Sequence, residues 1–177
     1  MQKILTTPVG ELRWAKVLTP DSTFDDDGVY SIEATFKTEE AKDLISAIDQ
    51  AAQNKLNLSQ KSNAITSVPY EHIENGLVRF KFKQKAKTKN LEFSVDVFDN
   101  ANKKWDVNTP IGNGSKGRVA FSLYEWEVPG KGVGCSAKLK AVQIIEHVAF
   151  DTSGADFYGF EAVEGSANSR NEVDIPF

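Results

Sequence analysis

Five cationic side chains lie at alternate positions along Leu77–Lys87, which reads LVRFKFKQKAK. Because successive side chains of a β-strand point to opposite faces, this spacing predicts one cationic face and one apolar face with Val78, Phe80 and Phe82. A polyanion would relieve the repulsion between neighbouring cations and would release counterions on binding. The alternatives are a solvated face or an edge strand protected by lysines. We call the cationic face the basic ribbon and expect phosphates to contact Arg79, Lys81, Lys83, Lys85 and Lys87.

Aromatic side chains share predicted faces with further cations elsewhere in the sequence. In Lys116–Trp126, alternation places Lys116 and Arg118 on the same face as Tyr124 and Trp126. A ring exposed beside cations can stack on an unpaired base, which stabilises binding by about 1–3 kcal/mol per base whatever the sequence. The alternative is that the rings belong to the core. The candidate DNA contacts outside the basic ribbon are Trp14, Lys16, Trp105, Lys116, Arg118, Tyr124, Trp126, Lys138 and Lys140.

No set of residues has the spacing of a catalytic or metal site. The two histidines, His72 and His147, fit local structural or surface roles, and Cys135 is better interpreted as a buried strand thiol than as a nucleophile. The acidic run Asp25–Asp27 lacks calcium-loop spacing, and the glycine-containing segment Pro110–Lys116 lacks phosphate-loop spacing. We therefore expect a non-enzymatic protein with no catalytic residue, no metal site and no cofactor.

Net charge hides an asymmetry along the chain. The 177 residues carry a formal charge of −4, which at first sight argues against a nucleic-acid partner. From Asp151 onward, however, carboxylates are opposed by Arg170 alone, so the remainder is close to neutral. A lone cysteine, with neither a signal-peptide pattern nor a long apolar run, predicts a cytoplasmic protein (in the host cell cytoplasm, if it is phage-encoded) and no membrane partner.

Hydrophobic periodicity predicts a mainly β chain with one principal α-helix. Apolar residues at helical spacing predict a helix over Glu39–Leu56 with Thr38 as its N-cap, and Asn57–Asn75 reads as a long connection. Turn signals separate the strands, which suggests a small closed antiparallel barrel. The predicted strands are Gly10–Leu18, Val29–Phe36, Leu77–Lys87, Lys89–Phe98, Lys116–Trp126 and Val133–Phe150, with a hairpin turn at Thr88–Asn90.

The most specific signal is the C-terminal segment Asn171–Phe177, which reads NEVDIPF. Pro176 restricts the backbone, while the ring and carboxylate of Phe177 suit a pocket that contains an arginine or lysine. The alternative is an uninformative frayed end. We expect a flexible acidic tail whose tip binds a protein partner through Asp174, Ile175, Pro176 and Phe177.

This tip resembles that of bacterial single-stranded DNA-binding proteins, which end in Asp-Ile-Pro-Phe. The segments Ile111–Tyr124 and Ala137–Val148 resemble phage single-stranded DNA-binding proteins of the podophage replication type. The resemblance implies an OB-like β-barrel domain over residues 1–158 and a partner-binding tail over residues 159–177. It also implies sequence-independent binding of single-stranded DNA in replication, recombination and repair. The implied partners of the tip are a polymerase, a helicase or a primase.

Three points stay open at the level of sequence. The resemblance implies that the acidic tail can occupy the DNA groove until DNA displaces it, which the charge asymmetry permits. A DNA-annealing or recombination-mediator protein, a metal-dependent nuclease and a structural phage protein are the alternative functions. A homodimer is one oligomeric state that the sequence allows.

Overall fold

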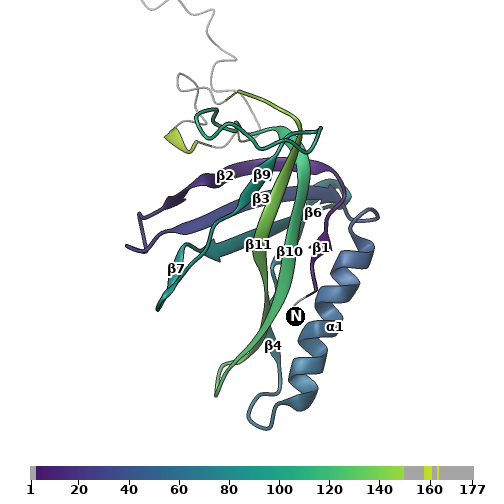
Figure 1. Ribbon diagram of the computed structural model, residues 1–177. Helices are drawn as coiled ribbons and strands as arrows, with labels where there is room; N and C mark the ends of the chain where they lie inside the picture. The colour runs from purple at the N-terminus through teal and green to yellow at the C-terminus, as the bar shows by residue number, and fades with distance from the viewer. Residues whose placement is uncertain (1–2, 150–157, 161–162, 164–177) are drawn as a thin grey trace, which may run out of the picture.

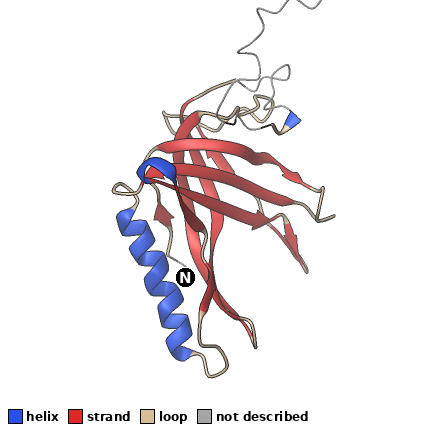
Figure 2. Ribbon diagram, turned by 180° about the vertical axis from the view of Figure 1, so that it is seen from behind, coloured by secondary structure: helices blue, strands red, loops and turns tan. Residues whose placement is uncertain are grey.

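The computed structural model describes residues 3–149, 158–160 and 163. Within them, strands dominate and the chain forms one α-helix, α1 (Lys42–Leu58), and one 3-10 turn, η1 (Glu74–Gly76) (Figures 1 and 2). That helix is not long and apolar enough to cross a membrane. The strands are β1 (Leu5–Thr6), β2 (Gly10–Asp21), β3 (Val29–Lys37), β4 (Ile65–Ser67), β5 (Tyr70–Ile73), β6 (Leu77–Lys85), β7 (Lys87–Thr88), β8 (Leu91–Glu92), β9 (Asp96–Phe98), β10 (Ser115–Val128) and β11 (Gly132–Glu146).

Five strands close a barrel in the order β2-β3-β6-β11-β10 and back to β2. Four of the five pairings are antiparallel, and the fifth joins β6 to β11 in parallel where Lys83 lies opposite Lys138. A small five-stranded barrel of this kind is an OB-like fold. The predicted mainly β, OB-like barrel with one principal helix is therefore confirmed. The expectation of wholly antiparallel closure was wrong, because alternation indicates the faces of a strand but not the direction of its partner.

The barrel interior is filled by the apolar face that alternation predicts on β6. Val78, Phe80 and Phe82 are all fully buried. The ring of Phe82 lies 5.1 Å from that of Phe121 on β10 and 6.0 Å from that of Phe80, measured between ring centroids. Because these rings fix one face of β6 inside the barrel, the basic ribbon must face outward.

Helix α1 covers β10 and β11 with the apolar stripe that includes Leu44, Ile48 and Ala52. It begins at Lys42, three residues later than expected, and Ala41 precedes it without a side-chain cap. The prediction that Thr38 caps the helix was wrong, because residues 38–41 form a turn before the helix begins, which leaves Thr38 too far from its first N–H groups.

The segment predicted as one strand over Lys89–Phe98 forms two, β8 and β9. Strand β8 pairs with β7 in a separate two-stranded sheet, whereas β9 pairs in parallel with β11. The chain therefore leaves one sheet and enters the other between β8 and β9. As a result, Leu91 is 63% exposed and Val97 is buried. The hairpin at Thr88–Asn90 is confirmed. The connection 57–75 contains β4, parallel to β11, and β5, antiparallel to β6.

Replacing Phe82 by alanine should lower the free energy of unfolding by about 3–5 kcal/mol, because it opens a cavity between two buried rings. Urea denaturation followed by circular dichroism measures the loss. Leu91→Ala on the exposed β8 is the matched control and should cost far less. Equal losses for the two variants would contradict the barrel interior described above.

Candidate nucleic-acid interface

The basic ribbon exists as an outward face of β6. Arg79 is half-buried and Lys81, Lys83 and Lys85 are exposed, in alternation with buried residues. Lys87 lies beyond this strand in β7, where its ammonium is 3.9 Å from the Glu92 carboxylate. The ribbon along β6 thus consists of four cations rather than five. Its contact with phosphates stays a prediction.

The ribbon lines a groove with a volume of about 750 Å³. Its opposite walls are the segment 67–71, which leads into β5, and a patch of β10 and β11 that includes Tyr124 and Lys138. Five cationic side chains line the groove, against the single carboxylate of Glu71. A concave surface of this charge concentrates polyanions, even though the protein as a whole is acidic.

Lys138 and Tyr124 bring the predicted combination of a cation and a ring into this groove. Lys138 pairs in register with Lys83, so two cations lie side by side on neighbouring strands. The Lys138 ammonium lies 4.4 Å from the centroid of the Tyr124 ring, which is 45% exposed. An exposed ring beside one cation, with a second cation on the neighbouring strand, can stack a base while the phosphates are neutralised.

Charge is distributed unequally along the ribbon. Arg79 forms an ion pair with Glu71 of β5, and the hydrogen bond from Arg79 lowers the pKa of Glu71. The Lys81 ammonium lies 3.7 Å from a carboxylate oxygen of Glu33 on β3. Among the described residues, Lys83 and Lys85 form no ion pair. The excess positive charge therefore lies toward the β7 end of β6.

Two aromatic residues that sequence reasoning missed lie near this groove or on a neighbouring loop. Tyr70 lines the groove, donates a hydrogen bond to Asp49 of α1 at 2.5 Å, and packs 5.7 Å from Phe80 between ring centroids. Burial and the Asp49 bond raise the pKa of Tyr70 to about 12. Phe24, in the turn between β2 and β3, is 98% exposed, and loops at this position bind nucleic acid in OB-folds. Sequence reasoning missed Phe24 because acidic and polar residues surround it, and it missed Tyr70 because the contacts of that ring come from distant segments.

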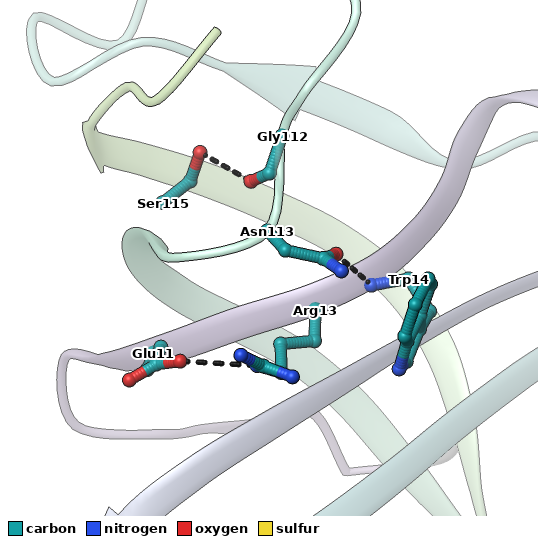
Figure 3. Close-up of polar contacts among 6 residues, drawn as sticks. All are labelled: Glu11, Arg13, Trp14, Gly112, Asn113 and Ser115. Carbon is teal, nitrogen blue, oxygen red and sulfur yellow. Dashed lines mark hydrogen bonds and ion pairs between the residues drawn. The ribbon is translucent and has the colours of Figure 1, made fainter. Parts of the chain in front are cut away.

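On β2, a bulge separates Trp14 from the regular alternation. Between the register pairs formed by Arg13 and Lys16, β2 contains one residue more than β3, and Trp14 has φ 52°. The Trp14 backbone N–H donates to Asn113 Oδ1 at 2.8 Å, as Figure 3 shows. Lys16 shares the outer sheet face with Lys83 through Ser31 but is ion-paired with Asp21 at 2.7 Å. Hydrogen bonds from Lys16 and Thr23 lower the pKa of Asp21 to about 2.

The remaining predicted contacts lie outside the groove. The Trp105 indole N–H donates to the Thr109 carbonyl at 2.9 Å, and the Trp126 indole N–H donates to Ser136 Oγ at 3.1 Å while its ring covers Gly134. The Lys116 ammonium is 3.6 Å from a carboxylate oxygen of Glu146. The roles of these side chains in DNA binding stay predictions, as do those of Arg118 on β10 and Lys140 on β11.

The predicted tail, residues 159–177, lies almost wholly outside the described residues. So does the whole predicted partner-binding tip, Asp174, Ile175, Pro176 and Phe177. The tail boundary and the role of the tip therefore stay predictions.

No family model matches the chain, and no curated protein matches it. Its fold is that of phage single-stranded DNA-binding proteins. One is gp2.5, a single-stranded DNA-binding protein encoded by bacteriophage T7, with a TM-score of 0.74, 22% identity and coverage of 94% of this chain and 98% of that chain. Another is the single-stranded DNA-binding protein of bacteriophage Enc34 in complex with single-stranded DNA, with a TM-score of 0.64, 13% identity and coverage of 84% and 89%. The likeness confirms the fold that the sequence resemblance implied.

Cys135 should resist thiol reagents in the folded protein. It lines the groove but is only 1% exposed, and burial, helped by the charge of Glu125, raises its pKa to about 11. At pH 8 the reactive thiolate is scarce, so Ellman's reagent should label Cys135 slowly until guanidinium unfolds the chain. Rapid stoichiometric labelling of the folded protein would show that the floor of the groove is open.

Proposed function

We propose that the protein binds single-stranded DNA without regard to sequence, through the groove between β6, the segment 67–71 and the β10–β11 hairpin. The observation that carries this proposal is the Lys83–Lys138–Tyr124 cluster, where Lys138 lies over an exposed ring and Lys83 is its register partner on the neighbouring strand. The phosphates of the strand lie against the ammonium groups, and a base stacks on the ring. Neither contact reads base edges, so affinity is independent of sequence.

The same arrangement favours single strands over duplex. In a duplex the base faces are stacked on one another and cannot reach Tyr124, whereas phosphates alone give only salt-sensitive binding. The Enc34 protein, which has this fold, was solved with single-stranded DNA, and this supports the assignment. No chemistry is needed for such a role, so we propose a non-enzymatic protein.

We further propose that the protein acts in phage DNA replication, recombination and repair, in the host cell cytoplasm. The acidic residues 159–177 form its tail, and the tip Asp174–Phe177 recruits a polymerase, helicase or primase. This part of the proposal rests on the sequence of the tip and on the chemistry of a terminal ring and carboxylate. We propose that the acidic tail occupies the cationic groove when DNA is absent and that single-stranded DNA displaces it. The opposite charges of the tail and the groove are consistent with this.

Fluorescence anisotropy with labelled oligo-dT and with a duplex of equal length tests the binding function. We expect tighter binding of oligo-dT, and Tyr124→Ala should weaken it by about 1–3 kcal/mol through the loss of base stacking. Leu58→Ala, an exposed residue at the end of α1, is the control and should bind as the wild type does. Equal, weak binding of both nucleic acids at low ionic strength would refute the proposal.

Deleting Asp174–Phe177 tests the tip separately. The truncated protein should bind oligo-dT at least as tightly as the full chain, because the deletion removes the negative charge of Asp174 and no cation. It should fail to bind the cognate replicative polymerase, as measured by surface plasmon resonance. A marked loss of DNA affinity, with polymerase binding unchanged, would reverse the assignment.

A further inference from the structure

Glu33 places a carboxylate in the middle of the basic ribbon. It is the register partner of Lys81 across the β3–β6 ladder, so both side chains stand on the same outer face of the sheet. The Lys81 ammonium lies 3.7 Å from Glu33 Oε1, and the Glu33 side chain is 22% exposed. Strand register, rather than a loop, places these two residues opposite each other.

An ammonium already paired with a carboxylate contributes little to phosphate binding. The pair is neutral as a whole, and a phosphate that approaches Lys81 also approaches Glu33, so the attraction to the ammonium is offset by repulsion from the carboxylate. Arg79, the outward-facing residue of β6 that precedes Lys81, is likewise ion-paired with Glu71 of β5. The half of the ribbon nearest β5 is thereby close to neutral.

The other half of the groove has the opposite character. Lys83, Lys85 and Lys138 line it, and within the part of the chain that the structure describes none of them forms an ion pair. Lys83 faces Ser31, and Lys85 faces Val29, across the same ladder that sets Glu33 against Lys81. A phosphate here meets cations without a competing carboxylate.

We propose that Glu33 is an affinity-limiting residue, which confines phosphate contact to the Lys83–Lys85–Lys138 half of the groove and keeps Lys81 out of it. This inference rests on the proposed function. Its consequence is a DNA strand held firmly at one half of the groove and weakly at the other, which suits a binding protein that replication enzymes must displace from DNA.

Four variants test the proposal by their salt dependence of oligo-dT binding, measured by fluorescence anisotropy. Glu33→Gln frees Lys81 and should steepen the log–log slope by about 0.7, which gives about fivefold tighter relative binding between 1 M and 0.1 M salt. The double variant Glu33→Gln/Lys81→Gln removes a neutral pair and should return to the wild-type slope. Lys83→Gln should flatten the slope by about 0.7. Lys42→Gln, an exposed α1 cation outside the groove, should change nothing.

The outcomes separate the two proposals. If wild-type protein prefers single strands but Glu33→Gln binds no more tightly, Glu33 does not limit affinity and the inference fails while the proposed function stands. If the double variant binds as weakly as Lys83→Gln, Lys81 contacts phosphate despite Glu33 and the inference also fails. If the wild type shows no preference for single strands, both are wrong. Thermal melting of each variant confirms that the barrel is intact.

Discussion

The pairing of β6 with β11 at Lys83 and Lys138 is the contact on which the barrel and the groove both depend. It closes the ring of strands that begins at β2, and it sets two cations beside each other on the outer surface. The antiparallel register of β10 with β11 brings Lys138 over Tyr124. Without the parallel contact, the Lys83–Lys85 end of β6 would be a lysine-rich edge of the kind that protects sheets from aggregation, while β5 would still pair with the other end. Closure of the fold therefore brings together the side chains of the candidate interface.

Net charge is a poor guide to this surface, because affinity for a polyanion depends on local potential. The protein carries a formal charge of −4, yet five cations line one groove with a single carboxylate. Partial neutralisation by Glu33 and Glu71 grades that potential along β6. If DNA contacts only the unpaired cations of one half of the groove, the salt dependence of binding is shallow, because each phosphate neutralised contributes only about 0.7 to the log–log slope for single strands.

Local periodicity predicted which segments form strands and the helix. Pairing between distant segments decided where strands bulge, where they break and which charges pair. Alternation located the two faces of β6, and helical spacing located the apolar stripe of α1, because each pattern depends on near neighbours along the chain. The bulge at Trp14, the split between β8 and β9, and the ion pair of Lys81 with Glu33 depend on partners from distant segments. Tyr70 escaped notice because its role comes from α1 and Phe80, which no local pattern reveals.

Photocross-linking tests the central claim most directly, since it reports where the strand lies. Oligo-dT that contains 5-iododeoxyuridine would be cross-linked to the wild-type protein, and the modified peptides would be identified by mass spectrometry. We expect cross-links at Tyr124, the exposed ring that lines the groove beside Lys138. Cross-links confined to α1, or to the strand surfaces outside the groove, would contradict it.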